Sequence, residues 1–429
     1  MKTILKQTTL AVGLLAATAS FAQSGADVVS QQRQVGAFKT IQIAGPYNAV
    51  IKAQGTQSLA LSGSKDQLAD IETFIRGDTL VVRNRKKFTI GFSFNKHSER
   101  ATIAITAPML KGVHLSGSGN VTLDQVSGEA FRIEVDGPGK LQASGTVREL
   151  RVDSSGSGDL SLEKLSATNV TLDMSGPGDV AMAGISGQLQ IDASGSGDLR
   201  ATGLRTTRVS AQMDGPGNVS LAGASRELKL EVSGSGDFAG CELAVEAASA
   251  QLDGPGNACV SGKIKAFDAE VHGSGDLVVH GLMADKARLE LSGPGNATLD
   301  GAVGALNAEV SGSGDLDGAK LNVANADLRG SGPGEIRLAT VSGNLHASMS
   351  GSGALTAAMA GKRLAMTMEG PGGARVSGKV ESVKATLHGS GSLDGRDLLV
   401  SANTEIEVDG PGNAKIGATS FNRRSSRNK

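Results

Sequence analysis

The sequence predicts an all-β protein that folds as a parallel β-helix, a solenoid of about sixteen coils of 19 to 20 residues with a β-rich cap at its N-terminal end. Three observations predict this fold. A glycine turn motif recurs at a constant spacing, apolar and polar residues alternate around each turn, and aromatic residues are scarce. The 429 residues include 60 glycines, ten phenylalanines, one tyrosine and no tryptophan. Such a chain must build its core from thin layers of aliphatic side chains.

The turn motif is Gly-Ser-Gly or Gly-Pro-Gly, and the two versions alternate without a break, as in residues 155–159 (SGSGD) and 175–179 (SGPGD). Eight of the ten prolines occupy this one position. Periodicity of this kind indicates a repeat architecture. Glycine would allow a sharp corner with positive φ, and proline presets φ. The first glycine of the motif occurs sixteen times, at positions 117, 137, 156, 176, 195, 215, 234, 254, 273, 293, 312, 332, 351, 370, 389 and 410.

Side chains alternate on both sides of each turn. The residue four positions after the first glycine is apolar or alanine in all sixteen copies, and so is the residue four positions before it, for example Val121 and Val113. The residue three positions before the glycine is polar, as in His114 and Glu134. This period of two predicts two short strands per repeat, each with one buried face. Sixteen coils spaced by about 4.8 Å would form a rod of roughly 75 Å.

An eight-bladed β-propeller is the alternative fold, because the double repeat of 39 residues could form one blade. Propeller strands run from a crowded centre to an exposed rim, so the two halves of a blade should differ in burial pattern. Here the halves match position for position, which favours the solenoid.

The region of residues 36–115 lacks the strict repeat and is expected to cap the solenoid. Strands are expected at residues 39–43, 48–53, 58–62, 79–83, 88–94 and 101–106. Residues 64–67 (SKDQ) form a capping-box pattern, which predicts a short helix extending to Phe74. Four basic residues, Arg83, Arg85, Lys86 and Lys87, are interpreted as part of a solvated hairpin.

The two ends of the chain have their own signals. Lys2 and Lys6, an apolar stretch at residues 10–17 and small residues at Ser20 and Ala22 predict a secretory signal peptide at residues 1–22. We expect a linker at residues 23–35, the repeats at 116–418 and a basic tail at 419–429. No segment is long enough to be a permanent transmembrane helix. The protein is therefore expected to be exported to the periplasm, the outer-membrane surface or the extracellular space.

Five short segments of the chain together resemble the GIN-domain family of auto-transporter adhesin heads, and the resemblance covers residues 38 to about 418. This resemblance implies a right-handed parallel β-helix on an exported adhesin. The chain departs from the family pattern in its many repeats and in its Ser/Pro alternation. The segments are residues 38–45 (FKTIQIAG), 49–51 (AVI), 78–82 (DTLVV), 107–110 (APML) and 114–120 (HLSGSGN).

An acidic column is predicted three residues before the turns, and basic residues two positions earlier should offset much of its charge. Asp173 and Asp192 lack such neighbours, so a solvated face is weighed there against binding of a weak cation or a basic partner. The column comprises Glu134, Asp153, Asp173, Asp192, Glu231, Glu270, Glu290, Glu309 and Glu407, and the basic residues are Arg132, Arg151, Lys229, Arg288 and Lys384.

Other metal or catalytic sites are not expected. A calcium ion needs six to eight oxygen ligands with several carboxylates, whereas each turn carries at most one carboxylate, as Asp214 does beside Asn218. These residues should instead form Asx-type hydrogen bonds and side-chain ladders. Cys241 and Cys259 lie at different offsets in their repeats, which favours two free thiols over a disulfide.

Function is predicted from what the repeats contain. The net charge of −1 gives no reason to expect nucleic-acid binding. A polysaccharide-degrading β-helix enzyme needs clustered carboxylates in a cleft, and no catalytic, cofactor-binding or metal-binding residue is predicted. The favoured function is a non-catalytic surface or adhesion rod that contacts an unknown protein or glycan ligand. The main alternative is a structural scaffold of the periplasm or envelope.

Overall fold

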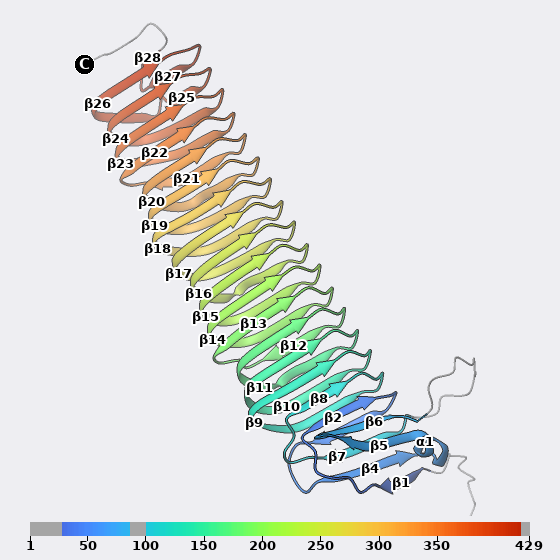
Figure 1. The fold of residues 1–429 in the computed structure, drawn as a ribbon. Helices are drawn as coiled ribbons and strands as arrows, with labels where there is room; N and C mark the ends of the chain where they lie inside the picture. The colour runs from blue at the N-terminus through green and yellow to red at the C-terminus, as the bar shows by residue number, and fades with distance from the viewer. Residues whose placement is uncertain (1–27, 86–99, 422–429) are drawn as a thin grey trace, which may run out of the picture.

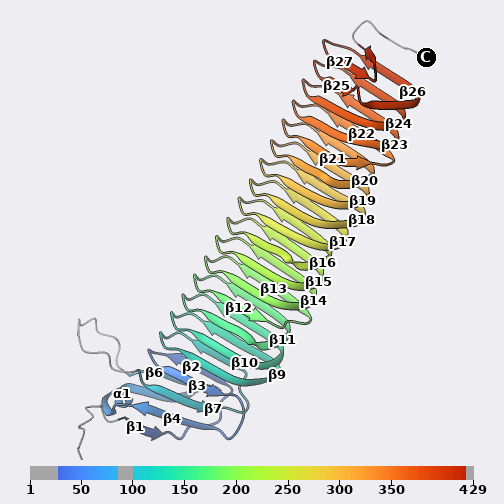
Figure 2. The same ribbon diagram turned by 180° about the vertical axis from the view of Figure 1, so that it is seen from behind.

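Successive coils stack on one another through parallel strand pairing and form a long, straight rod (Figures 1 and 2). The computed structural model describes residues 28–85 and 100–421. Several predicted features lie outside the described residues. They are the signal peptide, the strand expected at 88–94, Lys86, Lys87 and residues 422–429 of the expected tail. Each coil pairs with the next coil in parallel register, as Leu141 does with Leu160. This pairing confirms the solenoid and excludes the propeller, whose blades need antiparallel neighbours.

Most coils run as one long strand between two turns of the motif, with a bend in the middle that divides it between two facing sheets. Such a coil is β9, in which Val121 and Leu123 point into the core before the bend and Ile133 and Val135 after it. These strands are β9 (Val121–Val135), β10 (Leu141–Ser154), β11 (Leu160–Met174), β14 (Leu199–Met213), β15 (Val219–Val232), β16 (Phe238–Leu252), β17 (Ala258–Val271), β18 (Leu277–Leu291), β19 (Ala297–Val310), β20 (Leu316–Gly330), β23 (Ala354–Met368) and β24 (Gly373–Leu387).

Three coils show the two predicted short strands as separate elements, because pairing stops at the bend. They are formed by β12 (Val180–Ala183) with β13 (Gln188–Ala193), β21 (Ile336–Val341) with β22 (Asn344–Met349), and β25 (Ser392–Gly395) with β26 (Leu398–Val408).

The aliphatic core follows the predicted alternation. The residue four positions after the first glycine stacks on its counterpart in the next coil, for example Val219 on Phe238, and both are almost fully buried. The phenylalanines of the described repeats, Phe131, Phe238 and Phe267, also point into the core. The rod therefore has one continuous aliphatic interior between its two sheets.

The glycines of the turn motif are needed for a reason that differs from the one expected. Of the sixteen first glycines, only Gly410 has a φ in the left-handed region. Instead, the coils approach so closely that a Cβ built on Gly236 would lie 2.0 Å from the carbonyl oxygen of Gly217. The expectation of positive φ at this corner is thus wrong. The motif needs glycine here because a side chain would collide with the backbone of the neighbouring coil.

Positive φ is found at the bend on the other side of the coil. Glycines eight residues after the first glycine of the motif, such as Gly145 (φ 140°) and Gly223 (φ 133°), turn the chain from one sheet to the other. At such values of φ a residue with a side chain is strained. This second glycine column is visible in the sequence but was not recognised there.

The stacking begins earlier than the strict repeat. Strands β2 (Thr40–Ala44) and β3 (Asn48–Lys52) pair in parallel with β8 (Gly112–Leu115) and β9, so they form a coil within the range 36–115 assigned to the cap. Gly45, Pro46 and Asn48 occupy the positions of a Gly-Pro-Gly-Asn turn, with Tyr47 in place of the second glycine.

The remaining N-terminal elements cover the end of the two sheets. Strand β6 continues one sheet beside β2, and β7 continues the other beside β3. Antiparallel strands then close these edges: β5 pairs with β6, β4 pairs with β7, and β1 pairs with β4. The elements are β1 (Val29–Gln32), β4 (Ser58–Gly63), α1 (Lys65–Asp70), β5 (Ile71–Arg76), β6 (Thr79–Asn84) and β7 (Thr102–Thr106).

The predicted helix exists but is shorter than expected. Its capping box is confirmed, since the Ser64 hydroxyl accepts from the Gln67 N–H while the Gln67 side chain accepts from the Ser64 N–H. The helix ends at Asp70 because Ile71, Phe74 and their neighbours pair with β6 as strand β5. The segment expected as a linker likewise contains β1, which pairs with β4.

At the other end, β27 (Asn413–Ile416) stacks on β25, and β28 (Thr419–Phe421) folds back on β27 as an antiparallel hairpin. The first residues of the expected tail thus cover the last coil. Among the described residues, no helix has the length and apolar character needed to cross a membrane.

Candidate functional site

The acidic column lies on the outer face of one sheet. Parallel register places Glu134, Asp153, Asp173 and Asp192 side by side on four successive coils. Farther along the rod, Glu270, Glu290 and Glu309 are neighbours in the same way. Glutamines at 212 and 251 interrupt the column between these groups. The sequence therefore identified both the column and its stacking.

Basic residues two positions earlier offset this charge, as expected. Arg132 contacts Glu134 at 2.5 Å and Asp153 at 3.0 Å. Arg288 bridges Glu270 and Glu290, each at 2.8 Å, and these contacts raise the pKa of its guanidinium. Exposed pairs of this kind contribute only about 0 to 1 kcal/mol each, so their main effect is to balance charge along the face. Further pairs join Arg151 to Asp153, Lys229 to Glu231 and Lys384 to Glu405.

The gap in the basic residues at Asp173 and Asp192 is confirmed. The positions two residues earlier hold Thr171 and Gln190, and the Gln190 amide donates to Asp192 at 3.3 Å. Two adjacent carboxylates on a flat, exposed face provide too few ligands for calcium without several waters.

A second ladder follows the turn motif itself. From Asp159 to Asp315, the residue after each turn accepts a hydrogen bond at its side-chain oxygen from the backbone N–H of its counterpart in the next coil, at 2.7 to 3.5 Å. Asn218, Asn257 and Asn296 also donate their amides to the preceding aspartate. This confirms the expected Asx ladder and leaves these carboxylates engaged in the fold.

At the start of the ladder, Lys140 pairs with Asp159 at 2.7 Å. The hydrogen bond from Lys140 lowers the pKa of Asp159 below its ordinary value. Lys140 thus pairs with a carboxylate of the next coil.

The cap contains a groove of about 760 Å³ lined by parts of β1, α1 and β5. Its central side chain is Arg33, whose guanidinium donates to the carbonyls of Ile71 (2.7 Å) and Leu68 (2.9 Å) and to Thr73 (3.1 Å). Burial lowers the pKa of Arg33. Because its donors are already used within the fold, Arg33 clamps the cap rather than offering a free anion site.

The basic cluster beside this groove is partly described. Arg83 lies on the β5–β6 hairpin, pairs with Glu72 at 2.9 Å and covers the Phe74 ring at 4.9 Å. This agrees with the interpretation of Arg83 as part of a hairpin.

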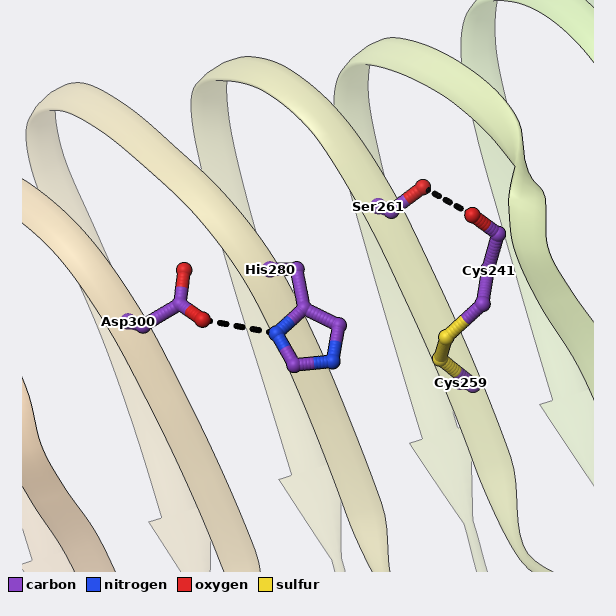
Figure 3. Close-up of a disulfide and its surroundings, with 5 residues drawn as sticks. All are labelled: Cys241, Cys259, Ser261, His280 and Asp300. Atoms are coloured by element: carbon purple, nitrogen blue, oxygen red, sulfur yellow. Dashed lines mark hydrogen bonds and ion pairs between the residues drawn. A yellow bond between two sulfur atoms is a disulfide. The ribbon is translucent and has the colours of Figure 1, made fainter.

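Cys241 and Cys259 form a disulfide, so the expectation of two free thiols is wrong (Figure 3). Their offsets after the first glycine are seven and five, and a difference of two keeps both side chains on the outer face. A register shift between β16 and β17, after Gly240, then brings the two Cα atoms to 5.2 Å.

Two further side chains complete a cluster on the next coils. His280 lies beside the disulfide, and its Nδ1 is 2.7 Å from Asp300 Oδ2 (Figure 3). The N–H of Gly281 also donates to Asp300, at 2.7 Å. Partial burial raises the pKa of Asp300, but these hydrogen bonds outweigh it, so the pKa lies below its ordinary value.

The sequence contained a signal for this cluster that was not used. Cys241, Ser261, His280 and Asp300 all lie seven residues after the first glycine of successive turns. In a solenoid, equal offsets on successive coils mean neighbouring side chains.

The fold and its outer faces define a class of protein, a parallel β-solenoid with regular, charge-balanced polar surfaces. The family described as "Putative auto-transporter adhesin, head GIN domain" matches residues 37–186, 181–282, 259–356 and 340–421. The chain belongs to this family, which confirms the resemblance found in the sequence.

The solved structures that match the chain are distant in sequence. One is described as a putative adhesin from Bacteroides fragilis, with 15% identity over 82% of this chain and 98% of that chain, and a TM-score of 0.25. Another is described as a putative lipid binding protein from Parabacteroides distasonis, with 16% identity over 68% and 96% and a TM-score of 0.34. A putative adhesin from the same species has 14% identity over 69% and 96% and a TM-score of 0.33. No curated protein matches the chain.

Proposed function

We propose that the protein is an exported, non-catalytic adhesion rod that presents the outer faces of the solenoid to a protein or glycan ligand on another surface. The observation that carries the proposal is the family match, which extends over almost all of the described chain. Adhesion is the property named in the description of that family.

The regular outer faces support this role. Similar polar groups recur on neighbouring coils, about 4.8 Å apart. A partner with its own repeated groups could then make many weak contacts at once, and such contacts together give high avidity. A rigid rod favours this mode because its groups are already arranged before binding.

The same faces argue against polysaccharide cleavage. Glycoside hydrolysis needs two carboxyl groups flanking the bond, usually within a substrate cleft. In the described repeats the carboxylates stand on flat sheets and many are engaged in ladders or ion pairs, such as Glu270 and Glu290 with Arg288. The phenylalanines that could serve as sugar platforms, including Phe238 and Phe267, are buried.

Two experiments test the proposal. Intact bacteria that express the chain with its own N-terminal segment are labelled with a membrane-impermeant biotin ester. We expect labelling without permeabilisation. Labelling only after the outer membrane is opened would refute surface exposure and favour the envelope scaffold.

The purified chain is then applied to arrays of glycans and extracellular-matrix proteins. A variant with Glu270, Arg288 and Glu290 changed to glutamine alters the acidic column. A second variant, Asp317→Asn with Arg337→Gln, alters the other sheet, where these two residues are neighbours. We expect binding to the array, and weakening by only one of the two variants identifies the contact face. Absence of binding together with turnover of a polysaccharide would overturn the proposal in favour of an enzyme.

A further inference from the structure

The cluster of Cys241, Cys259, His280 and Asp300 contains the elements of a metal site. The two sulfur atoms and a ring nitrogen of His280 all lie within 4.8 Å of one another. The chain has only two cysteines, and both are in this cluster. All three side chains are on the outer surface, at least partly exposed, so an ion could enter from solvent.

Asp300 determines which nitrogen of His280 is available. An ionised carboxylate can only accept hydrogen bonds, so the close contact with Asp300 Oδ2 requires the proton to be on Nδ1. In the neutral imidazole, Nε2 then carries the lone pair that a metal ion needs. Figure 3 shows the His280 ring between Asp300 and the two cysteines, with its other nitrogen on the side of the sulfur atoms. A carboxylate that orients a histidine in this way is the usual outer partner of a zinc-binding imidazole.

The backbone around the cluster is held in place. Asp300 is itself fixed by the Gly281 N–H, and the Ser261 hydroxyl donates to the Cys241 carbonyl at 2.6 Å. The ligands come from three successive coils of the rod, β16, β17 and β18, whose positions are maintained by parallel pairing. Such a scaffold keeps the two thiols close together after the disulfide is reduced, so they need to move little to bind one ion.

We propose that this cluster is a redox-controlled zinc site, closed by the Cys241–Cys259 disulfide and opened when that bond is reduced. Zinc is bound by two thiolates, by Nε2 of His280 and by a water in the fourth position. Two thiolates and one imidazole match the ligand preference of Zn²⁺, and tetrahedral bond lengths of about 2.0 to 2.3 Å require the ligand atoms to be roughly 3.5 to 3.8 Å apart. The observed grouping, with all three ligand atoms within 4.8 Å of one another, is close to this spacing.

The chemistry balances with a dithiol as the reductant. The S–S bond breaks as two electrons and two protons pass to the cysteine sulfurs, while the dithiol is oxidised to its own disulfide. Zn²⁺ then displaces the two thiol protons, which leave to solvent. Neutral His280 contributes the lone pair of Nε2, and any imidazole that carries a proton there loses it when zinc binds. Zinc binding therefore releases one proton for each ligand atom that is protonated beforehand.

A purely structural disulfide is the competing explanation. In that case His280 and Asp300 would be ordinary surface residues, and reduction would only loosen the link between two coils. The two explanations differ in whether His280 and Asp300 affect zinc binding by the reduced chain.

The test uses the full chain, reduced with dithiothreitol, freed of reductant under argon and titrated with Zn²⁺ alone. We expect one equivalent to bind to the reduced chain and none to the oxidised chain. Substitution by Co²⁺ should give sulfur-to-metal charge-transfer absorption. One equivalent of Zn²⁺ should also protect both thiols from iodoacetamide.

Variants separate the roles of the side chains. Cys259→Ser should abolish binding. His280→Ala should weaken it by at least about tenfold, and Asp300→Asn should weaken it by about 10- to 100-fold with the stoichiometry unchanged. His346→Ala, which changes an exposed histidine on a distant coil, should leave affinity unchanged. Circular dichroism of each reduced variant verifies that the solenoid persists.

Two outcomes would overturn the proposal. One is a reduced, folded wild-type chain that binds no zinc at micromolar concentration and shows no cobalt–sulfur absorption. The other is equal zinc affinity in wild type, His280→Ala and Asp300→Asn. The cobalt spectrum of the wild type needs no variant, so the proposal remains testable even if a substitution disturbs folding.

Discussion

Replacement of Gly236 by alanine should break the stacking of two coils in the middle of the rod. The new Cβ would lie 2.0 Å from the carbonyl oxygen of Gly217 and 2.8 Å from its carbonyl carbon. Real Cβ atoms essentially never lie closer than 3.0 Å to such atoms, and the obstacle is backbone rather than a flexible side chain. The coils must therefore separate locally by roughly 1 Å, which shifts the hydrogen bonds of the turn beyond good geometry.

The expected loss follows from those hydrogen bonds. The Gly236 N–H donates to Gly215 at 3.2 Å, and the Gly234 N–H donates to Met213 at 2.9 Å. Each backbone group left unpaired in a buried position costs about 1 to 3 kcal/mol, so loss of both hydrogen bonds should cost roughly 2 to 6 kcal/mol. Since each coil contacts only its neighbours, the damage should remain local.

Two measurements check this prediction. Urea denaturation followed by circular dichroism reports the loss of stability, and hydrogen exchange followed by mass spectrometry should show faster exchange in the coils around residues 213–236. Gly373→Ala is the matched control, because the nearest atom to its Cβ is 3.8 Å away and its φ is outside the left-handed region. The control should change stability by less than about 1 kcal/mol. Equal behaviour of the two variants would refute the steric explanation of the motif glycines.

Three other predictions follow from single sites. Tyr47→Phe should stabilise the cap by about 1 kcal/mol in denaturation, because the Tyr47 hydroxyl is buried with no hydrogen-bond partner among the described residues; a loss of stability would contradict this. Hydrogen bonds from the Arg396 side chain and backbone hold the pKa of Asp394 well below its ordinary value near 4. A depressed pKa gives stability that is present above that value and lost as the pH falls through the folded-state pKa. Asp394→Asn should therefore lower the melting temperature at pH 7, and the difference from wild type should shrink in strong acid; a constant difference would exclude this explanation. Calorimetric titration with calcium should give no heat, whereas a signal lost on Asp173→Asn with Asp192→Asn would reveal a cation site between these carboxylates.

The functional surfaces were partly predictable from the sequence. The acidic column, its arginines and the Asx ladder follow from equal offsets within a repeat, because in a solenoid equal offsets place side chains on one line. The disulfide was missed because Cys241 and Cys259 have unequal offsets, whereas His280 shares the offset of Cys241 and could have been found from it. The meeting of the two cysteines depends on the register shift after Gly240, which no local pattern reveals.

The sequence by itself determined the solenoid, the burial of alternate residues and the start of the helix after its N-cap, Ser64. Each of these is a local or periodic property, set by turn residues, side-chain alternation and capping. Only the tertiary structure decided that the helix ends at Asp70, that Gly45 and Pro46 begin the first coil, and that the motif glycines are required by contact between coils. These features depend on which backbone segment lies directly beside another in space, and that neighbour exists only once the strands have paired and the coils have stacked.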